Sequence, residues 1–104
     1  MKDYKIKITM GMYDNIFIPK KMIPLNKEEL PFVSDKTDWQ TKDFDCRLES
    51  IKINSEGYIE NYNHREYTGE ISFYDFINRK FTEFICNIEN GKIIFIERLD
   101  IHEH

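Results

Sequence analysis

The stretch FTEFICNIENGKIIFIERL, residues 81–99, decides the fold. Its centre, Asn90-Gly91, favours a two-residue type I′ turn, and runs of apolar residues lie on both sides of it. Counting outwards from the turn predicts these cross-strand pairs: Ile88–Ile93, Asn87–Ile94, Cys86–Phe95, Ile85–Ile96, Phe84–Glu97 and Glu83–Arg98. The last pair sets opposite charges across from each other, which supports the register. Because both faces are apolar near the turn, we expect both to be covered, by a second layer or by the proline-rich segment.

Alternation of apolar and polar residues predicts further strands outside this hairpin. They are residues 4–10 (YKIKITM), 15–18 (NIFI), 47–54 (RLESIKIN), 57–62 (GYIENY) and 70–76 (EISFYDF). Turns are predicted at residues 54–57 (Asn-Ser-Glu-Gly) and 78–80 (Asn-Arg-Lys). No long helical pattern occurs. The pattern therefore predicts a mainly β chain of one domain, residues 1–104: a small antiparallel meander forming a curled or barrel-like sheet.

The composition supports a folded β protein and excludes some functions. The chain has 104 residues, 40% hydrophobic and 33% charged, with 16 Ile and no Ala. A net charge of −4 argues against a dedicated nucleic-acid binder, which usually carries a basic stripe. No apolar run is long enough for a membrane span, and the start MKDYKIK predicts no signal peptide. Two cysteines, Cys46 and Cys86, are expected to be free thiols, with Cys86 in the core.

All three prolines lie between Pro19 and Asp38, where the periodicity is lost. Asn26 is expected to cap a single helical turn, KEEL, which Pro31 ends; it is the one short helix we predict. Loops of this length are usually functional or disordered. Because this loop carries several large apolar residues, we expect it to pack on the sheet and to offer a contact surface.

Four stretches carry a resemblance to a known group. GMYDNI, then WQTKDFDCRLESIKINSEGYI, YTGEISFYDF and FTEFICNIENGKIIFIERL occur in that order. Together they resemble small hypothetical proteins of bacteriophages and prophages that share a Gly-Met-aromatic-Asp start, a Gln-Thr-Lys-Asp-x-Asp-Cys core and a Gly-[Asp/Glu]-Ile-x-Phe-Tyr strand. The resemblance covers about three quarters of the chain. It implies a viral origin and a bacterial host cytoplasm, but no mechanism. Some proteins that look related carry a Cys-x-x-Cys pair in the early loop, which this chain lacks, so no zinc site carries over.

The most polar candidate site is WQTKDFDC, residues 39–46. Asp43 and Asp45 form a carboxylate pair that could bind a divalent cation, with Asp38 or Glu49 as a third ligand, and Lys42 could lie beside an anion. The alternative is a turn in which the carboxylates accept backbone N–H bonds while Trp39, Phe44 and Cys46 pack inwards. The candidate binding residues here are Trp39, Gln40, Lys42, Asp43 and Asp45.

A second candidate is NYNHREYTG, residues 61–69, in which aromatic residues alternate with cations. Such a mixture can stack on bases and hold phosphates, or can simply be a solvated strand pair. Its candidate binding residues are His64, Arg65 and Tyr67, and His64 could also approach Cys46 in space. The terminal His102-Glu103-His104 is read as a frayed tail. We assign no catalytic residue, no metal ligand and no cofactor.

These observations predict a phage-encoded accessory protein that binds without catalysis. Its partner would be a host protein, such as a defence component, or a small nucleotide that it sequesters. The alternatives are a small metal-dependent hydrolase that uses Asp43, Asp45 and His64, and a minor virion or assembly component. A homodimer is a further possibility, because a small β domain often has an edge strand to cover.

Overall fold

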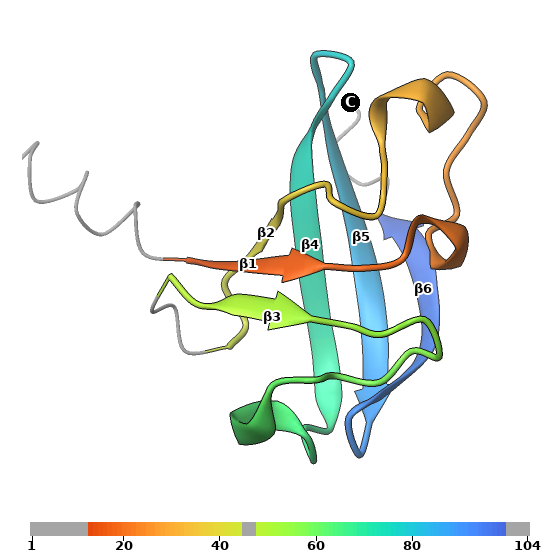
Figure 1. Ribbon diagram of the computed structural model, residues 1–104. Helices are drawn as coiled ribbons and strands as arrows, with labels where there is room; N and C mark the ends of the chain where they lie inside the picture. The colour runs from red at the N-terminus through yellow and green to blue at the C-terminus, as the bar shows by residue number, and fades with distance from the viewer. Residues whose placement is uncertain (1–12, 45–47, 100–104) are drawn as a thin grey trace, which may run out of the picture.

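The computed structural model describes residues 13–44 and 48–99. These residues form one curled six-stranded sheet with the strand order β3-β1-β2-β4-β5-β6 (Figure 1). The strands are β1 (Asp14–Phe17), β2 (Trp39–Thr41), β3 (Ser50–Lys52), β4 (Gly69–Ile77), β5 (Lys80–Glu89) and β6 (Lys92–Leu99). The predicted mainly β chain and its curled sheet are confirmed. The strand predicted at residues 4–10 lies outside the described residues.

The two long hairpins, β4–β5 and β5–β6, form where the sequence predicts them. Asn90 and Gly91 have φ angles of 49° and 78°, as a type I′ turn requires. Asn78 and Arg79 adopt the same left-handed region, with φ angles of 53° and 68°, and connect β4 to β5. These turns set the order of β4, β5 and β6, and the Asn90-Gly91 turn is also hydrogen-bonded to Thr68, to the Tyr67 carbonyl and to the Ile59 N–H.

The predicted register of the last hairpin holds only next to its turn. Ile88 pairs with Ile93 as expected, but a bulge follows, so that Asn87 pairs with Phe95 and Ile94 has no partner of its own. The remaining predicted pairs are therefore wrong by one residue: Cys86 pairs with Ile96, Ile85 with Glu97, and Phe84 with Arg98. Beyond the bulge, Ile96 stands opposite the buried Cys86 and Arg98 stands opposite the buried Phe84.

The expectation that both faces of this hairpin are covered is also wrong for the part of the chain that the structure describes. On the inner face Phe84 and Cys86 are fully buried. On the outer face the side chains of Ile94 and Phe95 are 54% and 48% exposed. The sheet curls around one core and leaves its convex side open.

The other three strands, β1, β2 and β3, are short, and β1 pairs with the other two although they lie far from it in the sequence. β1 pairs with β2 in antiparallel fashion and with β3 in parallel, so the sheet is mixed where we predicted an antiparallel meander. The predicted strand 47–54 is reduced to β3 among the described residues. Residues 57–62 contribute two isolated bridges, Ile53–Ile59 and Tyr58–Lys92. The second bridge joins the turn after β3 to the start of β6, so the curled sheet nearly closes at this end.

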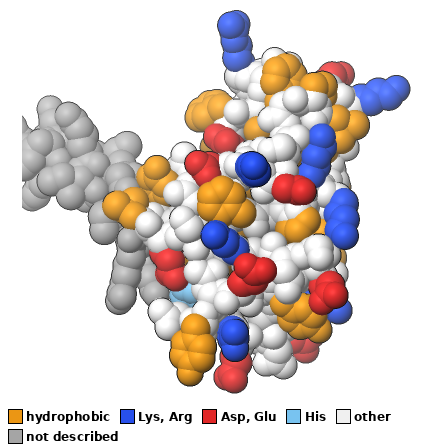
Figure 2. Space-filling model, in the orientation of Figure 1, with side chains coloured by type: hydrophobic (Ala, Val, Ile, Leu, Met, Phe, Trp, Pro, Cys, Tyr) orange, Lys and Arg blue, Asp and Glu red, His pale blue; other side chains and the backbone are white. Residues whose placement is uncertain are grey.

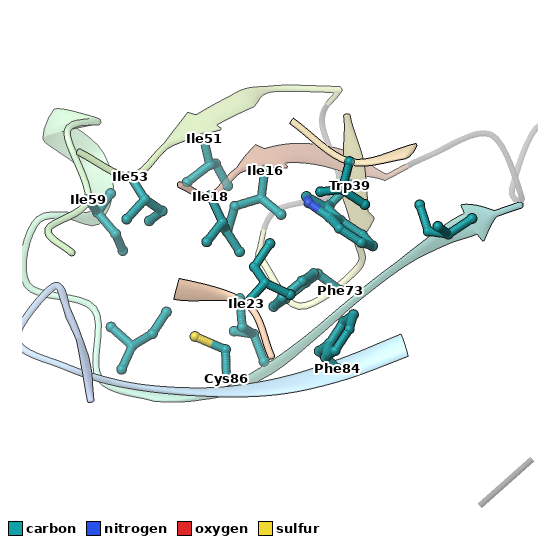
Figure 3. Packing of buried hydrophobic residues seen from close by; sticks show 14 residues of the cluster. Ile16, Ile18, Ile23, Trp39, Ile51, Ile53, Ile59, Phe73, Phe84 and Cys86 are labelled. Atoms are coloured by element: carbon teal, nitrogen blue, oxygen red, sulfur yellow. The ribbon is translucent and has the colours of Figure 1, made fainter. Parts of the chain in front are cut away.

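The core lies inside the curl (Figure 3). Trp39 makes edge-on contacts with Phe73 and Phe84, at ring-centroid distances of 5.1 and 5.7 Å, and all three side chains are fully buried. Isoleucines from β1, β3 and the early loop fill the rest of the space, as Figure 3 shows for Ile16, Ile51 and Ile23. This packing is what the alternating β pattern predicts.

The proline-containing loop packs on the body as predicted, through buried Ile23 and Val33. Asn26 and Glu29 exchange hydrogen bonds: each backbone N–H donates to the other's side-chain oxygen, at 3.0 and 3.1 Å. This is a capping box, so the predicted capping role of Asn26 is confirmed. Pro31 does not end the turn, however, because it lies inside a 3₁₀ turn, η2 (Leu30–Phe32). With η1 (Lys20–Met22) and η3 (Tyr62–His64), the described residues contain three such 3₁₀ turns and no α-helix, which agrees with the prediction of at most one short helix.

Both edges of the sheet are covered over part of their length. At β3, the side chain of Asn61 acts like a neighbouring peptide: its Nδ2 donates to the Ser50 carbonyl and its Oδ1 accepts from the Lys52 N–H, both at 2.8 Å. At β6, the Ile93 N–H donates to the Gly57 carbonyl at 2.8 Å. No helix among the described residues is long and apolar enough to cross a membrane.

Candidate functional site

One arginine ties the proline-containing loop to the sheet. Arg98 on β6 donates from Nη2 and Nη1 to the two carboxylate oxygens of Glu29, at 2.6 and 3.0 Å, and from Nη2 to the Pro24 carbonyl at 3.3 Å. Its guanidinium also lies 5.1 Å from the ring centroid of Phe84. Two-pronged pairs of this kind fix orientation as well as distance. They hold the middle of the loop against the sheet.

The same contacts set the ionisation of Glu29. Burial by itself would raise the pKa of this carboxyl, but the hydrogen bonds from Arg98 and from the Asn26 N–H, with the charges of Arg98 and Lys80, outweigh it. The pKa of Glu29 therefore lies below its ordinary value. In the sheet Arg98 stands opposite Phe84 and not opposite Glu83 as predicted, and its guanidinium binds a carboxylate 69 positions away in the sequence.

The anchored loop forms one wall of a groove with a volume of about 990 Å³. The other wall is the outer side of β3 and the turn that follows it, where Phe17 of β1 and Lys52 of β3 are paired in the sheet. Ligand pockets in proteins typically range from about 300 to 1,000 Å³, so this groove is large for a chain of this size.

The groove has an apolar floor and a charged rim. Its apolar residues are Phe17, Pro19, Ile23, Leu30 and Ile53. Its rim carries four lysines (Lys20, Lys21, Lys36 and Lys52) against two carboxylates (Asp35 and Glu60). The chain as a whole is acidic, so this excess of cations is local. Figure 2 shows this face of the molecule, with hydrophobic side chains near its middle and charged side chains of both signs around them.

Two contacts shape the rim beside the loop. Lys20 Nζ donates to the Leu30 carbonyl at 2.8 Å, and the Lys20 N–H donates to the Asp35 carboxylate at 2.7 Å. Lys20 therefore has a structural role. Lys21, Lys36 and Lys52 are exposed and can meet a ligand.

The predicted stretch 39–46 behaves mainly as a structural turn in its described part. Trp39 is fully buried in the core, so its ring offers no surface to a partner. Its indole Nε1 is buried without a hydrogen-bond partner. Asp43 Oδ2 accepts the Ser72 N–H at 2.7 Å, so the carboxylate binds a backbone group, but one on β4, 29 positions away, and not within a local turn. Gln40 lies half-buried in β2, opposite Asn15 and Tyr74.

Phe44 connects the first candidate stretch, residues 39–46, to the second, residues 61–69. The ring of Phe44 lies 4.9 Å from the His64 ring and 4.8 Å from the Tyr67 ring. His64 is buried, and its Nε2 lies 3.1 Å from Glu49 Oε1. Burial, with a smaller contribution from the nearby Asp43 charge, raises the pKa of Tyr67. Asp43, His64 and Tyr67 thus gather on one side of the sheet, as parts of a packed aromatic cluster.

The remaining predicted residues are more exposed. Arg65 stacks over exposed Tyr62, with 5.5 Å from its guanidinium carbon to the ring centroid. Lys42 is exposed beside Asp43. Asp45 and Cys46 lie outside the described residues, so the Asp43–Asp45 pair and the Cys46–His64 approach are not described.

No metal site forms among residues 13–44 and 48–99. This part of the chain contains no group of three or more His, Cys, Asp or Glu side chains that could hold an ion. Cys86 is a free thiol with no exposed surface, and burial raises its pKa to about 12. Such a thiol is unreactive near neutral pH.

Sequence reasoning predicted that the loop packs on the sheet, which is confirmed, and that it offers a contact surface, which stays a prediction; it missed the groove. Of the rim residues, only Lys20, Lys21, Asp35 and Lys36 lie in the predicted loop. The opposite wall comes from β3 and the turn that follows it, which meet the loop only after folding. The one local signal was the Lys20-Lys21 pair directly after Pro19 in an otherwise acidic chain.

Comparisons with known proteins do not extend this description. No family model, curated protein or solved structure matches the chain.

Proposed function

We propose that this chain is a non-catalytic binding protein that holds its partner in the groove between the proline-containing loop and β3. The observation that carries the proposal is the groove itself: an apolar floor surrounded by lysines, in a chain that is otherwise acidic. Clefts of this volume that combine apolar lining with a few charged groups are typical of ligand-binding sites in proteins. The Arg98–Glu29 pair presets the shape of this surface, which lowers the cost of ordering it on binding.

The resemblance to phage and prophage proteins supports the biological side of the proposal. On that basis the chain is an accessory protein of a virus that acts in the cytoplasm of a bacterial host. Its partner is a host protein, with a defence component as the favoured class. The alternative is sequestration of a small nucleotide, which would use the same lysines. The following experiment distinguishes this alternative from a protein partner.

The test is native mass spectrometry of the tagged protein purified from bacterial cells, before and after gentle denaturation. The double variant Lys21→Glu/Lys52→Glu reverses two exposed rim charges. Lys27→Glu reverses an exposed charge on the same loop outside the groove, and serves as the matched control. Circular dichroism checks that all three proteins are folded.

We expect wild type and Lys27→Glu to retain a partner that the double variant loses. A released macromolecule identifies a protein partner, and a released mass of a few hundred daltons identifies a small ligand. A partner that the double variant retains as well as wild type does would contradict the assignment of the groove. A clean apo mass from every sample would contradict the proposal that the protein holds a partner under these conditions.

A further inference from the structure

The shape and chemistry of the groove point to one class of partner. We infer that it binds an acidic segment of another protein that also carries large apolar side chains. This inference rests on the proposed function and specifies the partner that the same site recognises. Three observations support it: the composition of the floor, the unused lysines of the rim, and the lack of groups suited to phosphate.

The floor is suited to side chains and not to a nucleobase. It is made of isoleucine, leucine and proline, with Phe17 as its one aromatic ring. Proteins that bind bases without sequence preference present aromatic faces for stacking. An aliphatic floor instead favours aliphatic or aromatic side chains of a partner. Covering them stabilises the complex in proportion to the apolar area removed from water.

The backbone along the groove has few donors left for phosphate. The N–H of Lys20 donates to Asp35, that of Ile23 to the Lys20 carbonyl, and that of Ile53 to the Phe17 carbonyl. Phosphate sites usually offer several free backbone N–H groups in a loop or at a helix start. Here those donors are already used within the described residues.

The charges of the rim fit carboxylates better than a polyphosphate. Lys21, Lys36 and Lys52 are exposed around the floor, so each ammonium can meet a separate carboxylate. Asp35 and Glu60 lie among them and would repel the concentrated charge of a di- or triphosphate. A peptide spreads its charges along its length and can place a neutral or basic residue opposite each carboxylate. The complementary partner is therefore an acidic, apolar peptide segment.

The experiment is fluorescence anisotropy with purified protein and three labelled synthetic peptides of equal length. The first combines Glu and Asp with Leu and Phe. In the second, Lys replaces each acidic residue, and in the third, Ser replaces each apolar residue. Each peptide is titrated with wild type, Lys21→Glu/Lys52→Glu and the control Lys27→Glu, at low and high salt.

We expect wild type and Lys27→Glu to bind the acidic apolar peptide more tightly than either reference peptide. The double variant should bind it roughly tenfold more weakly, since two attractive pairs become repulsive. Binding should weaken with salt, because exposed charges are screened. Equal affinity for the Lys peptide, or for the Ser peptide, would overturn the inference. So would displacement of the peptide by inorganic triphosphate at comparable concentrations.

This test fails separately from that of the proposed function. If the native mass spectra show a partner that depends on Lys21 and Lys52 while none of the peptides binds, the groove is the site and the acidic-segment inference is wrong. If the mass spectra show no partner but the acidic apolar peptide binds to the groove, the inferred preference for such a peptide is supported. The proposal that the protein holds a partner in bacterial cells is then wrong.

Discussion

Replacing Arg98 with Met should detach the proline-containing loop from β6. Met keeps a long apolar side chain over Phe84 but removes the guanidinium. Two hydrogen bonds to a carboxylate and one to a carbonyl are lost. Hydrogen bonds to charged groups contribute about 1.5–3 kcal/mol each. Because the Glu29 side chain is only 11% exposed, its charge would be left poorly solvated.

Relaxation of the loop would let water reach Glu29 and offset part of that loss. We therefore expect Arg98→Met to lower the free energy of unfolding by about 2–4 kcal/mol, a large share of the stability of a typical small domain. Urea denaturation followed by tryptophan fluorescence measures it, since Trp39 is the one tryptophan and lies in the core.

A double-mutant cycle with Glu29→Gln tests whether the pair is responsible. Gln keeps an oxygen that can accept the Asn26 N–H, so the capping contact survives in the single variant. We expect a coupling free energy of about 1.5 kcal/mol or more between positions 29 and 98. Additive effects, or a loss below about 0.5 kcal/mol for Arg98→Met, would refute the reasoning. In that case the loop must be held by its apolar contacts alone.

Three further predictions concern pH, a glycine and a thiol. The folded-state pKa of Glu29 lies below its unfolded value, so the ionised carboxylate contributes fully to the free energy of unfolding above the ordinary value of 4.5. This contribution should disappear as the pH falls through the folded pKa. In Glu29→Gln, the urea midpoint should therefore fall less steeply at acid pH than in wild type. Gly91→Ala should cost at least about 2 kcal/mol, since φ is positive and the new Cβ would overlap the Arg65 carbonyl. Gly57→Ala also has a positive φ, but its Cβ would meet Met22 and Ile93 only at ordinary contact distances, so it should cost less; equal losses would contradict the overlap. Peptide mapping after thiol labelling should find Cys86 modified only in urea, and labelling of the native protein would contradict its burial.

The parts of the fold that the sequence predicts are those fixed by neighbouring residues. Asn90-Gly91 specifies its turn because few other residues adopt positive φ twice in succession. β4 and the loop between Pro19 and Asp38 follow from alternation and from the prolines. Asn26 and Glu29 form their capping box three residues apart.

The parts that it does not predict depend on distant contacts. The bulge at Ile94 cannot be read from a run of apolar residues, since either register buries isoleucines. The parallel pairing of β1 with β3 joins residues 35 positions apart. The groove is built from such pairings, so its rim could not be assembled from local spacing. Among the predicted binding residues, Trp39 is fully buried, which agrees with the alternative that residues 39–46 form a turn whose aromatic residues pack inwards.

The side chain of Asn61 has a consequence for how this protein can associate. It binds two outward-facing backbone groups of β3, the Ser50 carbonyl and the Lys52 N–H, and the Glu60 N–H donates to the Lys52 carbonyl beside them, so the ladder stops there. At the opposite edge, the Gly57 carbonyl accepts the Ile93 N–H of β6, and the bulge at Ile94 breaks the regular spacing of that strand. A foreign strand therefore finds no long, regular template on the described sheet, and neither does a misfolded copy of the chain. We therefore expect this protein to bind a partner through side-chain contacts and not by adding a strand to its sheet. Substitutions that change its specificity should then lie among surface side chains.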